Sequence, residues 1–255
     1  MSRLFKALSL ALSVLTLSIV SVLAASCGSS GTQYRIVNAL SNPNGSSSFD
    51  VTINGAIVSP AGGMGFTYVQ PSKGYASISS GSDKVDVYLA GQADTPGAQP
   101  IVSSTVNLSG SNQYTIVMMG NSQTGPAPNG WAAQAFPDNN TLPATGNIEV
   151  RVINAAVSLP GAVNVYVVPP PGSIVGANPT FTNVAFGQPS QQPTEYATLP
   201  VPSGNIYYVV VTTAQGTPLI STSYPFTFGI YTIVLTDVQG GSTWSTSPVV
   251  LTDAQ

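Results

Sequence analysis

The chain has 255 residues, of which only 6% are charged and none is histidine, and its formal net charge at pH 7 is −3. Without histidine the chain lacks the side chain that most often acts as a general acid or base near neutral pH and as a metal ligand. The six basic residues form no cluster that could neutralise phosphates. The composition therefore argues against an enzyme and against nucleic-acid binding, and it indicates neither a cofactor nor a metal site.

The first 27 residues have the three-part layout of an export signal. A basic start with Arg3 and Lys6 precedes an uncharged apolar stretch from Ala7 to Leu23, and small residues lead to Cys27. Serine and threonine interrupt the apolar stretch, so a permanent membrane-spanning anchor is the weaker alternative. The sequence thus predicts an exported protein.

Cys27 is the only cysteine of the chain. The segment Leu23-Ala24-Ala25-Ser26-Cys27 resembles the lipobox of bacterial lipoproteins, in which a diacylglycerol is attached to the cysteine thiol and cleavage makes that cysteine the new N-terminus. Leucine is more usual than alanine at position 24, so ordinary cleavage near Ala25, which would give a secreted protein, stays open. We expect residues 1–26 to be a lipoprotein-type signal peptide and Cys27 to be lipidated.

A polar segment follows the cysteine, and we expect residues 27–32 to form a flexible tether. Acyl chains on Cys27 would hold the protein stably on a membrane. Because Gly28 rather than aspartate follows the cysteine, the sorting pattern of bacterial lipoproteins implies the outer membrane. The predicted location is the cell envelope, at the outer membrane or the cell surface.

Two segments recur in the chain at almost equal offsets. Tyr34-Arg35-Ile36-Val37-Asn38-Ala39 returns as Val150-Arg151-Val152-Ile153-Asn154-Ala155, and Gln113-Tyr114-Thr115-Ile116-Val117 returns as Ile230-Tyr231-Thr232-Ile233-Val234. Equal offsets at both ends of a unit indicate duplication. We predict one domain over residues 33–140 and a second over 147–255. The short linker, 141–146, contains one proline, so the two domains should lie end to end with restricted motion.

Both halves consist of short segments rich in Val, Ile, Thr and Tyr, separated by Gly, Pro, Asn and Ser. This pattern predicts an all-β protein of two tandem immunoglobulin-like antiparallel β-sandwiches with almost no helix. Asn54-Gly55 is typical of a type I′ turn, because both central residues need positive φ. The candidate strands are 33–39, 48–53, 65–69, 74–79, 84–89, 101–107, 113–119, 131–136, 148–155, 163–168, 181–186, 194–199, 205–213, 219–224, 229–236 and 244–251.

Four motifs together resemble the DUF4397 family of bacterial envelope proteins, a family defined by a domain of unknown function. They are Arg-Ile-Val-Asn-Ala from Arg35, Asp-Val-Thr-Ile-Asn-Gly from Asp50, Val-Pro-Ser-Gly from Val201, and Tyr-Thr-Ile-Val from Tyr114 and Tyr231. The resemblance covers both repeats and implies immunoglobulin-like sandwiches outside the cytoplasm, without an established activity. The second repeat departs from it at Asn164, where the first has Asp50.

Arg35 and Arg151 occupy the same place in the two repeats of a chain that has few charges. We expect each to lie at a sheet edge and to pair with a carboxylate, as a structural ion pair. The candidates are Asp50 or Asp138 for Arg35, and Glu149 or Asp253 for Arg151. The functional alternative is an anion-binding pair, which would require both guanidinium groups to be free in a cleft.

Two further groups have a functional and a structural interpretation. Asp83 and Asp86 could offer carboxylates to calcium, but they lack the usual loop pattern and a counterpart in the second repeat, which favours a solvated strand edge. Trp131 and Trp244 could stack on sugar rings if exposed, whereas their repeated position favours a shared structural role.

From these features we expect a non-enzymatic cell-envelope lipoprotein that acts as a structural or adhesion module. The alternative is a glycan-binding accessory protein that uses exposed aromatic residues. The expected partners are a membrane, through the N-terminal lipid, and an envelope polysaccharide or another surface protein, with no nucleic acid.

Overall fold

The computed structural model describes residues 31–41, 48–58, 65–110, 112–121, 130–190, 195–240 and 243–254. The predicted signal peptide, Cys27 and most of the predicted tether lie outside these residues. Residues Thr32–Gln255 form one compact unit. Within the described part of the chain, no helix has the length and apolar character needed to cross a membrane.

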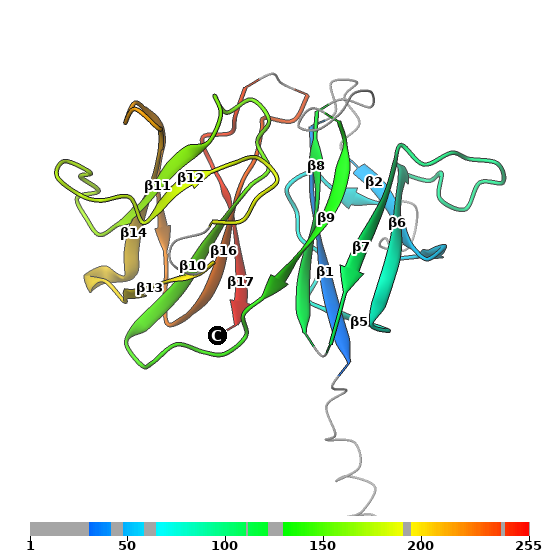
Figure 1. The fold of residues 1–255 in the computed structure, drawn as a ribbon, viewed down its shortest axis with the longest axis horizontal. Coiled ribbons are helices and arrows are strands. Elements are labelled where there is room, and N and C mark those ends of the chain that lie inside the picture. The colour runs from blue at the N-terminus through cyan, green and yellow to red at the C-terminus, as the bar shows by residue number, and fades with distance from the viewer. Residues whose placement is uncertain are drawn as a thin grey trace, which may run out of the picture. The chain divides into compact units, whose positions relative to one another are not determined.

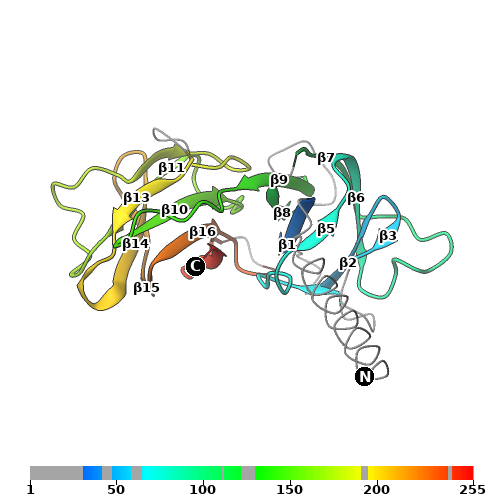
Figure 2. The same ribbon diagram turned by 90° about the horizontal axis from the view of Figure 1, so that it is seen from below.

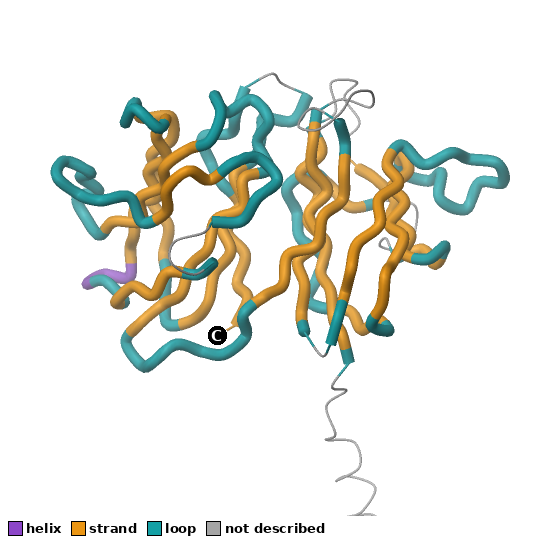
Figure 3. Tube along the Cα trace, viewed as in Figure 1, coloured by secondary structure: helices purple, strands orange, loops and turns teal. Residues whose placement is uncertain are grey.

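Strands make up the regular structure of the described residues, apart from one 3-10 turn at Ser203–Asn205 (Figure 3). The all-β prediction is confirmed, and every predicted strand overlaps an observed one; the last lies later than expected, and the short β3 was not predicted. The strands are β1 (Thr32–Leu40), β2 (Ser48–Ile53), β3 (Ala56–Ile57), β4 (Phe66–Thr67), β5 (Ala76–Ile78), β6 (Gly81–Leu89), β7 (Val102–Leu108), β8 (Gln113–Gly120), β9 (Ala132–Asp138), β10 (Asn147–Asn154), β11 (Val163–Val168), β12 (Phe181–Val184), β13 (Ala197–Pro200), β14 (Ile206–Thr213), β15 (Pro218–Pro225), β16 (Gly229–Leu235) and β17 (Val249–Ala254).

The strands form two β-sandwiches (Figure 1). The first packs the sheet β5-β1-β8-β9 against the sheet β3-β2-β6-β7, with β4 paired to β2, around one apolar core. The second packs β13-β10-β16-β17 against β12-β11-β14-β15 around another core. Corresponding strands follow the same order in both sandwiches. Pairing is antiparallel except between β1 and β8 and between β10 and β16, which are parallel, so the two sheets that contain these pairs are mixed.

The central strand β1 is buried on both faces. Tyr34, Ile36 and Leu40 enter the core of the first sandwich, whereas Val37 and Ala39 on the opposite face belong to a third apolar cluster. Residues of the second sandwich complete that cluster, among them Ile153, Ala155, Val234 and Leu251. Strands that are buried on both faces have apolar residues at consecutive positions, as at Ile36-Val37 and Ala39-Leu40 of β1 and from Ile116 to Met119 of β8.

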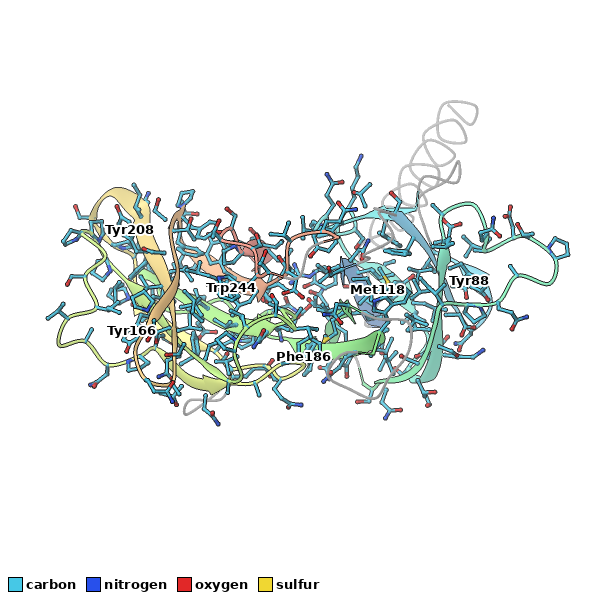
Figure 4. All side chains as sticks on the ribbon, turned by 90° about the horizontal axis from the view of Figure 1, so that it is seen from above. Tyr88, Met118, Tyr166, Phe186, Tyr208 and Trp244 are labelled. Atoms are coloured by element: carbon cyan, nitrogen blue, oxygen red, sulfur yellow. The ribbon has the colours of Figure 1, made fainter. Side chains whose placement is uncertain are left out.

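The third cluster joins the two sandwiches through their sheets β5-β1-β8-β9 and β13-β10-β16-β17. Figure 2 shows the ribbons of the two sandwiches side by side. Phe186 packs against this cluster and lies between the two sandwiches (Figure 4). The expectation that the two halves lie end to end is therefore wrong. Its physical reason is the second apolar face of the central strands, which the second sandwich keeps from water.

Local geometry agrees with the sequence at the first hairpin. Asn54 and Gly55 have φ values of 51° and 81°, as the predicted type I′ turn requires. β8 and β16 each have an anchored tyrosine near their start: the Tyr114 hydroxyl donates to the carbonyl of Ser109 at 3.0 Å, and the Tyr231 hydroxyl donates to the carbonyl of Thr227 at 3.1 Å. A tyrosine that bonds back to the preceding corner is typical of immunoglobulin-like sandwiches.

Candidate functional site

Arg35 projects from β1 towards the second sandwich and is 4% exposed. Its Nε donates to Thr115 Oγ1 at 2.8 Å, within its own sandwich. Its Nη1 donates to the carbonyl of Thr252 at 2.9 Å, and its Nη2 donates to Asp253, both on β17 of the other sandwich. Arg35 therefore binds both sandwiches at once.

Arg151 on β10 repeats this arrangement in the opposite direction and is fully buried. Its Nε donates to Thr232 Oγ1 at 2.9 Å, its Nη1 donates to the carbonyl of Pro137 at 2.6 Å, and its Nη2 donates to Asp138. Pro137 and Asp138 end β9 of the first sandwich, just as Thr252 and Asp253 lie on β17 of the second. Arg151 has one additional partner, Glu195, whose Oε1 lies 2.7 Å from its Nη1.

Each aspartate is also held from within its own sandwich by a threonine and a tyrosine. Asp138 accepts hydrogen bonds from Thr115 Oγ1 at 2.9 Å and from the Tyr75 hydroxyl at 2.6 Å. Asp253 accepts them from Thr232 Oγ1 at 2.7 Å and from the Tyr196 hydroxyl at 2.9 Å. We call these eight residues the crossed network: Arg35, Tyr75, Thr115, Asp138, Arg151, Tyr196, Thr232 and Asp253.

The two tyrosines also stack on the arginines. The guanidinium carbon of Arg35 lies 5.1 Å from the ring centre of Tyr75, and that of Arg151 lies 5.0 Å from the ring centre of Tyr196. Both distances are in the range of cation–π contacts. Burial raises the pKa of both tyrosines, and nearby aspartates raise it further, so both hydroxyls stay protonated as hydrogen-bond donors.

The crossed network has two positive and two negative side chains and is closed to solvent at both arginines. Because each guanidinium group already has charged and neutral acceptors, it offers little to an external anion. Buried arginine–carboxylate pairs of this kind depend on each other, since loss of one partner leaves an uncompensated buried charge. The arrangement is therefore suited to holding the two sandwiches in one register.

With this geometry established, the chain can be compared with known proteins. The family model described as "Domain of unknown function (DUF4397)" matches residues 32–168, more than half of the chain. The chain belongs to the DUF4397 family. No curated protein sequence matches this DUF4397 protein. A solved structure entitled "Alpha-glucan binding by a streptococcal virulence factor" is similar at 10% identity, covering 85% of this chain and 97% of that one, with a TM-score of 0.26. A TM-score this low supports no conclusion about function.

Of the ion pairs expected for this DUF4397 protein, Arg35 with Asp138 is present, with Nε and Oδ2 3.8 Å apart, whereas Asp50 and Glu149 have other partners. Asp50 lies on β2, whose sheet is on the far side of the first core, so it cannot meet the outer face of β1. Its Oδ2 instead accepts a hydrogen bond from the Gly91 backbone at 2.6 Å. Glu149 accepts one from Asn139 Nδ2 at 2.7 Å. The direct hydrogen bonds between arginine and aspartate join the two sandwiches, whereas the ion pairs Arg35–Asp138 and Arg151–Glu195 lie within one sandwich each.

The two tryptophans are half-buried and pack against the two cores. Trp131 contacts Phe49 edge to face, with ring centres 6.4 Å apart, and its buried indole nitrogen has no hydrogen-bond partner among the residues that the structure describes. The indole nitrogen of Trp244 donates to the carbonyl of Leu219 at 3.3 Å. These positions favour the structural interpretation over a shared sugar-stacking surface.

The acidic residues of β6 have local partners. Asp83 accepts a hydrogen bond from Asn54 Nδ2 at 2.6 Å, and Asp86 lies 2.9 Å from the ammonium group of Lys84. Within the described ranges, no three of the His, Cys, Asp and Glu side chains are grouped so that they could hold a metal ion.

Sequence reasoning missed the role of Thr115, Thr232, Tyr75 and Tyr196. A signal for the threonines exists: each is a polar residue in the middle of a repeated apolar strand, Tyr-Thr-Ile-Val. The tyrosines lie on segments that the repeat does not align, so only the structure brings them to the aspartates.

Proposed function

We propose that this DUF4397 protein is a non-enzymatic lipoprotein of the bacterial cell envelope, built from two copies of one sandwich domain that act together as a rigid structural or adhesion module. The observation that carries the proposal is the crossed network. It ties the sandwiches together through two buried arginine–aspartate pairs that run in opposite directions. A module that bears load or presents a surface benefits from such a fixed geometry.

The correspondence between the halves supports the duplication. Arg35 and Arg151 donate through the same three nitrogens to partners of the same kind, a threonine, a backbone carbonyl and an aspartate of the other sandwich. Together with the recurring motifs, this favours two copies of one unit facing each other across an approximate two-fold axis.

The anchoring part of the proposal rests on the sequence of residues 1–32. Cys27 carries the lipid, the following polar segment spaces the sandwiches from the bilayer, and the membrane is the first partner. The second partner is another surface protein or an envelope polysaccharide.

Replacing the cysteine tests the anchor. In cells that express the full chain, Cys27→Ser should move the protein from the membrane fraction to the soluble fraction, while Ser29→Ala should leave it in the membrane fraction. Retention of the Cys27→Ser protein in the membrane fraction would contradict the lipid anchor.

A pull-down from intact envelope tests the role as a module. The purified protein should capture a defined surface protein or polysaccharide, and Asp138→Asn, which loosens the crossed network, should weaken capture. The glycan-binding alternative predicts instead that tryptophan fluorescence changes on addition of envelope polysaccharide. The half-buried indoles of Trp131 and Trp244 give that alternative little support.

A further inference from the structure

The first sandwich contains a cavity of about 470 Å³ between β1 and the segment from β4 to β5. This volume is within the range of small-molecule sites, about 300–1,000 Å³. Most of the surface that lines it is apolar. The described lining residues are Tyr34, Ile36, Val58, Gly65, Phe66, Thr67, Gln70, Pro71, Ser72, Lys73, Gly74, Tyr75 and Ala76.

The cavity lies where the two sandwiches differ. In the first, the amide of Asn38 donates to the carbonyl of Phe66 on β4; in the second, the equivalent Asn154 donates to Val184 on β12. β4 has two residues, whereas β12 has four and places the rings and methyl groups of Phe181 and Val184 in the core.

Lys73 supplies a positive charge at the lining of this cavity. Arg35, Arg151 and Lys84 each have a carboxylate partner within 4 Å, so Lys73 is the one basic residue of the described ranges that has none. None of the described residues lining the cavity is acidic. The charge of the site therefore complements an anion.

Tyr34 supplies a polar group in the apolar wall. The residue as a whole is 7% exposed and lines the cavity, and its hydroxyl makes no hydrogen bond within the described ranges. Burial raises its pKa, which keeps the hydroxyl protonated. The second sandwich has Val150 at the equivalent position, so the fold does not require a hydroxyl there.

We propose that this cavity binds a small amphiphile that has an apolar body and a single carboxylate. The apolar body covers Ile36 and Phe66, the carboxylate faces the ammonium group of Lys73, and the Tyr34 hydroxyl donates a hydrogen bond to an oxygen of the ligand. This site shares Tyr75 with the crossed network, and it adds a ligand to the envelope module proposed above without depending on the lipid anchor.

Calorimetry with decanoate, and with decanol as its uncharged counterpart, tests the site on the purified chain. Decanoate should bind with one site per chain, and decanol should bind at least about tenfold more weakly, because it lacks the charge that Lys73 complements. Lys73→Gln should weaken decanoate binding by a similar factor. Lys84→Gln, which removes the other lysine that follows Cys27, is the matched control and should bind like the wild type.

Filling the cavity tests the location. Ala76 is exposed and pairs with Tyr34 across β1 and β5, so Ala76→Phe places a ring beside the cavity without entering the core. It should abolish decanoate binding and keep the melting temperature of the wild type. The proposal would be overturned if decanol and decanoate bound equally, or if Lys73→Gln or a folded Ala76→Phe bound decanoate like the wild type. It would also be overturned if the chain bound a peptide with an apolar C-terminal residue but did not bind decanoate.

Discussion

Arg35 and Asp253 are 218 positions apart in the chain and form a buried ion pair between the two sandwiches. Arg151 and Asp138 form the matching pair in the other direction. Each aspartate holds a threonine of its own sandwich and an arginine of the other, so neither sandwich completes its hydrogen bonds without its neighbour.

The first prediction concerns the charge of Asp253. Asp253→Asn keeps the shape of the side chain but leaves Arg35 with less compensation for its buried charge. We expect the free energy of unfolding to fall by about 3–5 kcal/mol, the usual effect of breaking a buried pair. Urea unfolding measures it, with Asp94→Asn on an exposed loop as the control. If both variants lose the same small amount of stability, the pair is unimportant.

The second prediction separates the observed pair from the one expected from sequence. In a double-mutant cycle of Arg35→Met and Asp253→Leu, the double variant should lose about 1–3 kcal/mol less free energy of unfolding than the two single variants lose together. The reason is that its two charges disappear together. The same cycle with Arg35→Met and Asp50→Leu should be additive within about 0.5 kcal/mol. Coupling of Arg35 to Asp50 rather than to Asp253 would contradict the structure.

The third prediction concerns alkaline pH. The pKa of Tyr75 and of Tyr196 is raised in the folded state, first by burial. The unfolded tyrosines ionise near pH 10, so above about this pH the unfolded state releases protons that the folded state keeps. Stability from these residues is full below the unfolded pKa and is lost as the pH rises above it.

Urea unfolding between about pH 8 and 11 should therefore show a steep loss of stability, up to about 1.4 kcal/mol per pH unit for each buried tyrosine above its unfolded pKa. The double variant Tyr75→Phe and Tyr196→Phe starts from a lower stability at pH 8 but should lose less as the pH rises. An equally steep loss in that variant would show that other groups cause it.

The positions of the strands could be predicted from the sequence because alternation and turn residues are local properties. The sequence also pointed to Asp138 and Asp253, but it assigned each to the arginine of its own copy, because a repeated motif suggests contacts within each copy. The direct hydrogen bonds run between the copies instead. One local signal was available: the runs from Tyr34 to Leu40 and from Tyr114 to Met119 do not alternate as a sheet with one solvated face would. Strands of this type need cover on both faces.

The chain contains two tryptophans, and each packs against the core of a different sandwich. Trp131→Phe leaves an indole that reports only on the second sandwich, and Trp244→Phe leaves one that reports only on the first. Circular dichroism of each variant measures the stability change that its substitution causes, and each fluorescence curve is corrected for that change. The corrected fluorescence transitions of the two variants in urea should then coincide. The reason is that the crossed network and the shared apolar cluster make the sandwiches one cooperative unit. Two separate transitions, with one sandwich unfolding while the other stays folded, would contradict the account.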